Sequence, residues 1–319
     1  MSAFAWFHPA GVELNAKWAA STQERLNMDA RLTLNGHVSD LGGGFVVRRL
    51  LPAARRQSVG PFIFFDHFGP LVQQPDAQTD VRPHPHIGLA TVTYLFEGAM
   101  MHRDSLGSVQ RIEPGAINWM TAGSGIVHSE RTPDDLRHVT RPMHGLQLWV
   151  ALPQALEEVS PSFTHTPADA IPEVRLPGCC VRVLVGQGWQ VSSPVKAASP
   201  TLYLDVQLDA GCSLDLPALA PEMAVYTVAQ ALTLDGEALP AQTMAMLSGA
   251  TRLANEGDAP ARFVVIGGEP LDGPRFIWWN FVSSDKARIT RAAQDWADAR
   301  FANVPGETER IELPARRPW

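Results

Sequence analysis

Residues 82–98 read RPHPHIGLATVTYLFEG, in which two closely spaced histidines precede a short run of aliphatic, threonine and aromatic residues. A run of this kind, closed by Gly98, is typical of a β-strand. Side chains two residues apart on a strand point to the same face, so His84 and His86 can aim at one point. The stretch therefore predicts a strand that carries two imidazoles on a single face.

Similar short segments, divided by glycine and proline, recur along the whole chain. Strand-like runs of about five to eight residues, separated by turn residues, are typical of a β-sandwich or barrel. Helical periodicity is confined to about residues 284–300, where Ser284 and Asp285 are candidate N-caps. We therefore expect an all-β protein with one helix near its C-terminus. The predicted strands span 44–51, 91–96, 116–120, 145–152, 180–185, 201–208, 224–228, 243–247 and 262–266.

A second same-face pair follows downstream, His128 and Glu130. If its strand lies beside that of His84 and His86, the four side chains can form one site. Three neutral imidazoles and one carboxylate suit Fe(II), Mn(II), Co(II), Ni(II) or Cu(II) and leave positions open for substrate or dioxygen. One such histidine pair alone is a weak signal, because most histidines are ordinary core or surface residues. Two pairs in a β-rich chain favour a metal site.

Histidines are distributed unevenly, since all ten of them lie at or before His165. If both halves share a fold, only the first can hold a histidine-ligated metal. His102 and Asp104 form another pair two residues apart, which we expect on an outer strand. His67 is either a residue near the site or a turn residue bonded to Asp66.

Composition excludes several classes of protein. The net charge of −7, without a basic stripe, argues against direct nucleic-acid binding. The first dozen residues do not resemble a secretory signal and no long apolar run follows, so we expect a cytoplasmic protein without a membrane partner. The three cysteines, Cys179, Cys180 and Cys212, show no metal-binding or disulfide spacing. We expect no disulfide framework.

Several motifs together resemble the pirin family, whose members are bicupins. The resemblance covers about residues 44–301 and implies two cupin, or jelly-roll type, β-barrel domains followed by the C-terminal helix. We expect an N-terminal extension at 1–30, a metal-binding cupin domain at 31–165, a metal-free cupin domain at 166–282, and the helix and tail at 283–319. The motifs are VGPFIFFDHFGP (59–70), RPHPHIGLATVTYLFEG (82–98), MHRDSLGS (101–108), IEPGAINWMTAGSGIVHSE (112–130) and GPRFIWWNFVSS (273–284).

The family resemblance also implies a ligand set. The general cupin pattern places a glutamate about five residues after its second histidine, and that position is Thr91 here. Glu130 supplies the missing carboxylate from the other strand. The residues that match the iron ligands of pirins are His84, His86, His128 and Glu130. We expect one divalent metal, Fe(II) first, with Mn, Co, Ni, Cu or Zn as alternatives.

Two functions of different classes follow from the resemblance. Several pirins are similar to dioxygenases that open the ring of quercetin or a related flavonol, and here Glu130 would act both as a ligand and as a catalytic proton acceptor. The alternative is a non-enzymatic, iron-binding and redox-sensitive protein that regulates an unidentified protein partner. Aromatic and methionine residues are candidates to line a flavonol site, although most should be plain core: Phe64, Phe65, Trp119, Met120, Met143 and Trp149.

Overall fold

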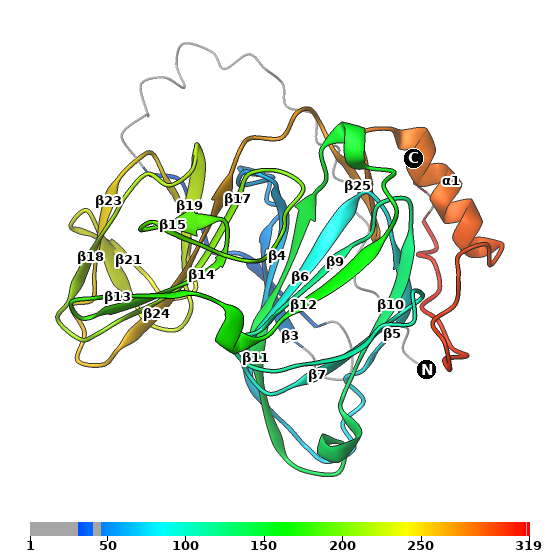
Figure 1. The fold of residues 1–319 in the computed structure, drawn as a ribbon, viewed down its shortest axis with the longest axis horizontal. Coiled ribbons are helices and arrows are strands. Elements are labelled where there is room, and N and C mark those ends of the chain that lie inside the picture. The colour runs from blue at the N-terminus through cyan, green and yellow to red at the C-terminus, as the bar shows by residue number, and fades with distance from the viewer. Residues whose placement is uncertain (1–30, 41–45, 317) are drawn as a thin grey trace.

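The computed structural model describes residues 31–40, 46–316 and 318–319. Its regular elements are almost all strands, which confirms the predicted all-β class. The expected N-terminal extension at 1–30 and the first residues of the strand expected at 44–51 lie outside the described residues. Figure 1 shows two groups of strands side by side, with the helix and the C-terminal tail on the outer side of the first group.

The first half of the chain forms two antiparallel sheets that enclose a barrel. Both are built from strands close in sequence, as expected for a cupin. The larger sheet runs in the order β12 (Ser162–Thr166), β9 (Ile117–Thr121), β6 (Leu89–Glu97), β11 (Arg141–Ala151), β4 (Phe62–Gln73), β3 (Val46–Leu51) and β2 (His37–Asp40). The smaller runs β5 (Val81–His86), β10 (Ile126–Arg131), β7 (Met100–Asp104) and β8 (Val109–Ile112).

The second half repeats this arrangement, and the first described strand, β1, belongs to its larger sheet. That sheet runs β1 (Thr33–Leu34), β22 (Met244–Leu247), β19 (Glu222–Thr227), β24 (Ala261–Gly268), β17 (Thr201–Leu208), β14 (Cys179–Val185) and β13 (Glu173–Leu176). The smaller runs β18 (Ser213–Leu216), β23 (Thr251–Ala254), β20 (Leu232–Leu234) and β21 (Glu237–Leu239). Two hairpins complete the strands: β15 (Gln187–Gly188) with β16 (Val191–Ser192), and β25 (Phe276–Trp278) with β26 (Phe281–Ser283). The exact domain boundaries stay predictions.

The expected helix is present as α1 (Lys286–Ala297). Asp285 is its N-cap, since its carboxylate accepts a hydrogen bond of 2.8 Å from the Ala287 N–H. The buried face of α1 includes Ile289 and Trp296, which pack with Phe281 beside the first barrel. Three short 3-10 turns also occur in the described chain, at Asp134–Leu136, Gln154–Leu156 and Ala168–Ala170. None of the described helices has the length and apolar character that crossing a bilayer requires.

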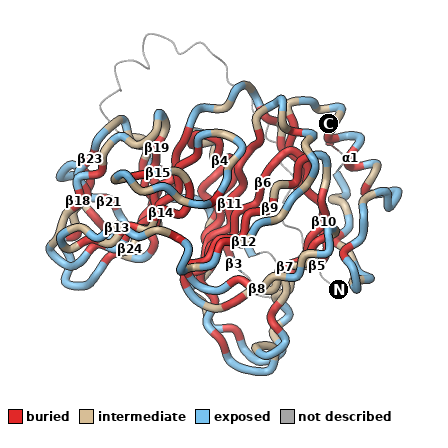
Figure 2. The backbone as a smooth tube through the Cα atoms, viewed as in Figure 1, coloured by how far each residue is buried: buried red, intermediate tan, exposed pale blue. Residues whose placement is uncertain are grey.

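The two halves pack through the outward faces of their larger sheets. Phe65 of β4 lies edge-on to Tyr226 of β19, with ring centroids 4.9 Å apart, and both belong to a core shared by the two halves. Nearly every residue of β6, β9 and β11 is buried, as Figure 2 shows. Strand alternation therefore assigns one face of this sheet to the interface between the halves and the other to the interior of the first barrel.

A buried polar contact crosses this interface at His67, which plays neither of the roles expected from the sequence. His67 Nδ1 lies 2.7 Å from the Tyr226 hydroxyl, and its Nε2 lies 2.8 Å from Nε2 of His144. Burial, with smaller effects of His144 and Arg48, lowers the pKa of His67 to about 3. Burial and Arg262 lower the pKa of His144 to about 4. Both rings are therefore neutral at physiological pH, and in the contact between them one Nε2 donates its proton and the other accepts it.

This histidine pair should make the metal-free protein less stable as the pH falls from about 6.5 to about 4. Over that range the unfolded chain takes up protons on His67 and His144, whose usual pKa is about 6.5, while the folded protein does not. Calorimetry should show that, between pH 7.5 and pH 5, the Tm of the double variant His67→Gln/His144→Gln falls by less than the Tm of the wild type. The exposed His138→Gln should keep the wild-type slope. Equal slopes in all three proteins would contradict the assignment.

Candidate metal centre

Strand β5 lies at the edge of its sheet, where β10 is its partner among the described strands. Pro83 and Pro85 lack an N–H, and proline within sheets is confined to edges and bulges. His84 stands directly opposite His128 in the β5–β10 ladder. The two prolines of β5 therefore fit its edge position, and its pairing with β10 brings His84 opposite His128.

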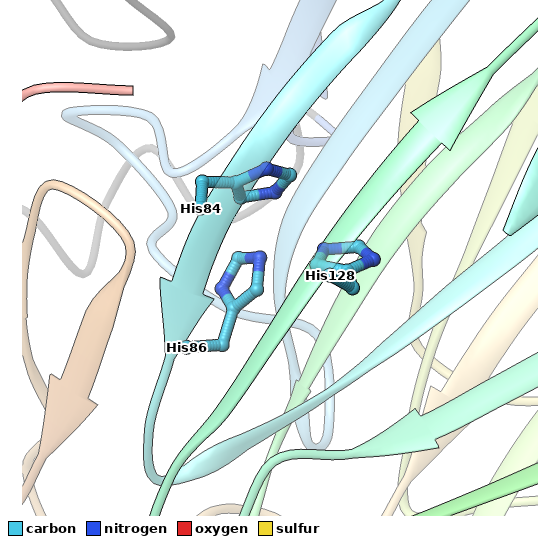
Figure 3. A group of neighbouring side chains, drawn as sticks. All are labelled: His84, His86 and His128. Carbon is cyan, nitrogen blue, oxygen red and sulfur yellow. The ribbon is translucent and has the colours of Figure 1, made fainter. Parts of the chain in front are cut away.

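Three imidazoles from these two strands converge. His84, His86 and His128 each offer a ring nitrogen, and the three atoms lie within 4.8 Å of one another. The ring centroids of His84 and His128 are 4.3 Å apart, and those of His86 and His128 are 5.0 Å apart. Figure 3 shows the three rings gathered on the same side of the strands. Among the residues that the structure describes, no other cluster of three or more His, Cys, Asp or Glu side chains meets this standard.

Backbone carbonyls orient two of the three rings. His84 Nδ1 lies 2.9 Å from the Arg82 carbonyl oxygen, and His86 Nδ1 lies 3.1 Å from that of Asn280. Because a carbonyl oxygen can only accept a hydrogen bond, Nδ1 of each neutral ring must carry the proton. Nε2 is then the nitrogen whose lone pair can bind a metal. Metal-binding histidines in proteins are commonly held by this kind of hydrogen bond through their other nitrogen.

His128 differs, because neither of its buried ring nitrogens has a hydrogen-bond partner. Leaving such an atom without a partner costs about 1–3 kcal/mol. Burial, followed by the neighbouring histidines, lowers the pKa of His128 well below its usual value. Burial also lowers the pKa of His84 to about 4 and that of His86 well below its usual range. Three neutral imidazoles that converge, one of them without a hydrogen-bond partner, fit a site for a divalent transition metal.

Glu130 lies two residues beyond His128 but outside the group of three. The β5–β10 ladder shifts register between the two, so His128 faces His84 whereas Glu130 faces Val81. Burial raises the pKa of the Glu130 carboxyl to about 7, and a side-chain hydrogen bond with Thr93 opposes that rise. A buried carboxyl therefore lies two residues along β10 from His128, and its role as the fourth ligand stays a prediction.

The expectation that His102 and Asp104 lie on an outer strand is wrong, since their strand β7 lies between β10 and β8 and both side chains are buried. His102 stands opposite Glu130 in the β7–β10 ladder, and its ring centroid is 5.4 Å from that of His128. Its Nε2 lies 2.9 Å from the Asp104 carboxylate, and its ring stacks on Phe163 at 4.2 Å. The two-residue spacing was the available signal, because it puts both side chains on one face of β7.

The candidate aromatic residues divide between the two faces of the larger sheet. Trp149 lies edge-on to His86 at 5.2 Å between ring centroids, and Phe64 stacks on Trp149 at 4.2 Å. Met120 belongs to the same buried cluster as these two aromatic residues. Phe65 and Trp119 instead belong to the core between the halves, and Met143 packs in the cluster that includes α1. Of these six candidates, Trp149 is the one in described ring contact with the histidine cluster.

Known proteins match this chain over most of its length. One family model, described as Pirin, matches residues 44–150, and another, described as Pirin C-terminal cupin domain, matches residues 203–302. A "Pirin-like protein" of Caulobacter vibrioides is 45% identical over 273 residues, which cover 85% of this chain and 94% of that protein.

Two further matches carry the name of an enzyme. A "Putative quercetin 2,3-dioxygenase" of Pseudomonas aeruginosa is 37% identical over 292 residues, 90% of each chain. The crystal structure of quercetin 2,3-dioxygenase from Acinetobacter baumannii has a TM-score of 0.81 at 34% identity, and the match covers 90% of this chain and 95% of that one. The two-cupin fold expected from the motifs is therefore confirmed.

Proposed function

This chain belongs to the pirin family, and from that premise we propose that it is a metal-dependent dioxygenase that opens the ring of quercetin or a related flavonol. The observation that carries the proposal is the convergence of the His84, His86 and His128 rings, together with the lack of a hydrogen-bond partner for either ring nitrogen of His128. The two relatives named as quercetin 2,3-dioxygenases support the choice of reaction. The ligand set that we propose is these three histidines with Glu130.

The proposed metal is iron(II), because imidazole and carboxylate ligands with open positions are typical of non-haem iron oxygenases. A metal held there would supply Lewis-acid activation of a flavonol hydroxyl and a redox-active centre for reaction with dioxygen. Imidazole and carboxylate also accept manganese, cobalt, nickel, copper and zinc. Elemental analysis of protein purified without added metal tests this choice directly.

The residues around the site support proton transfer and aromatic binding. Glu130 has a pKa of about 7 in its buried setting, which suits a group that accepts a proton near neutral pH. Trp149, with Phe64 stacked behind it, gives an apolar aromatic surface next to His86. Flat aromatic substrates bind well against such surfaces. The site thus combines a general base with an aromatic surface against which the substrate can bind.

We expect iron-loaded protein to consume flavonol and dioxygen together. Quercetin is added under anaerobic conditions, oxygen is then admitted, and loss of the flavonol absorbance is followed alongside oxygen uptake. Protein stripped of metal is the control and should show neither change. No turnover with any of the six candidate metals would remove the enzymatic proposal. In that case, capture of a protein partner that depends on the iron oxidation state would favour the regulatory alternative.

A further inference from the structure

The C-terminal tail beyond α1 packs on the outside of the two strands that bear the histidine cluster. Trp296 in α1 donates a hydrogen bond of 3.0 Å from Nε1 to the Ile311 carbonyl, and the Arg310 side chain donates one of 2.9 Å to the Trp296 carbonyl. The Ile311 N–H donates a hydrogen bond of 2.8 Å to the carbonyl of Pro83 in β5. In Figure 1 the red tail runs beside β5 and β10. It therefore ties α1 to β5.

Glu307 in this tail makes the corresponding contact with β10. Its carboxylate accepts hydrogen bonds from the Ser129 hydroxyl and from the Arg131 guanidinium, and Arg103 Nη1 lies 4.0 Å away. Only 6% of the Glu307 side chain is exposed, and Ser129 is fully buried beneath it. Ser129 lies between His128 and Glu130, so its side chain points to the opposite face of the strand. Glu307 thus contacts β10 directly behind the proposed ligands.

These contacts fall where the two strands are least well joined. The β5–β10 ladder shifts register between His128 and Glu130, and neither Pro83 nor Ser129 has a partner in it. β10 keeps its register with β7 through these residues, so the extra residue of the shift lies in β5. The position of β5 against β10 therefore depends at this point on contacts from outside their ladder. The tail bonds both residues from outside, Pro83 through Ile311 and Ser129 through Glu307.

We propose that Glu307 is a positioning residue of the metal centre, which fixes β10 so that His128 and Glu130 face the histidines of β5. This inference rests on the proposed metal centre. Glu307 lies beyond residues 203–302, the part of the chain matched by the C-terminal family model. The competing role is that of an ion pair that stabilises the fold and leaves the metal centre unchanged.

Cobalt(II) titration of metal-free protein separates these roles, because its visible absorption bands report the ligand geometry as well as the affinity. We expect Glu307→Ala to weaken cobalt binding by about 10- to 100-fold, the usual effect of losing a residue that supports a ligand, and to change the band shape. Ser129→Ala should act in the same direction. The double variant should bind cobalt no more weakly than Glu307→Ala, since both substitutions remove the same contact between Ser129 and Glu307.

Glu309→Gln is the matched control, because Glu309 is half exposed and lies 2.7 Å from the same Arg131 side chain. It should change cobalt affinity by no more than about fivefold, as expected for a surface ion pair. If Glu307→Ala lowers the Tm of the metal-free protein yet binds cobalt as Glu309→Gln does, the inference is wrong. Should Glu307→Ala fail to fold, Glu307→Gln keeps the size and one acceptor oxygen and carries the same comparison. Absence of cobalt binding by the wild type would instead overturn the metal centre itself, and the inference with it.

Discussion

Replacing His128 with alanine is expected to abolish tight metal binding while the metal-free protein stays folded. His128 is the member of the cluster that comes from β10, and both of its ring nitrogens are buried without a partner. The loss of affinity should exceed the roughly 10- to 100-fold effect of removing a residue that only supports a ligand. Affinity is measured by titration with iron(II) or cobalt(II), and metal content by elemental analysis after dialysis.

The stability of this variant follows from two opposing effects. Alanine leaves a cavity, which destabilises the fold, but it also removes two buried polar atoms whose missing partners cost about 1–3 kcal/mol each. We therefore expect the Tm of the metal-free variant to lie close to that of the wild type. The exposed His138 bonds only to Asp76 in the described structure, so His138→Ala should retain both metal and Tm. Retention of full metal binding by His128→Ala would refute the centre.

Strand alternation made the three-histidine cluster predictable. The spacing of His84 and His86 predicts a shared face whatever the register of β5, and the two rings do converge with His128. Glu130 was harder to place, because β5 carries an extra residue in its ladder with β10, which puts Val81 opposite Glu130, although β10 itself keeps its two-residue period beside β7. That irregularity depends on how β5 meets β10, which neither strand specifies alone. The prolines of β5 predict an edge or a bulge, but not the residue at which the shift occurs.

Strand β4 shows a second limit of the sequence. The segment that contains Gly69 and Pro70 reads as a turn, yet the structure continues β4 through it to Gln73. His67 in this strand contacts Tyr226 and His144, which are far from it in sequence. Contacts between the halves depend on how two complete sheets pack. Local patterns predict which faces are apolar, but they do not predict which polar side chains meet there.

Glu130→Gln is expected to reduce flavonol turnover by about 100- to 10,000-fold, the range that general-base catalysis contributes. Glutamine keeps the size of the side chain and loses both the negative charge and the ability to accept the substrate proton. Metal should still bind, more weakly, through the three imidazoles. The control is Thr91→Val, which alters a buried residue at the position where the general cupin pattern has its glutamate. Normal turnover by Glu130→Gln would exclude the proposed proton acceptor.

The pH dependence of metal affinity then tests Glu130 as a ligand. Burial raises its pKa to about 7 in the metal-free protein, so below that pH a metal must displace a proton to bind the carboxylate. The three imidazoles stay neutral throughout this range, because burial holds the pKa of His84 near about 4 and those of His86 and His128 well below 6.5. Wild-type affinity should therefore fall by up to about tenfold per pH unit as the pH drops from 7 to 6, one proton being displaced. In Glu130→Gln this slope should vanish, and an unchanged slope would show that the proton comes from another group.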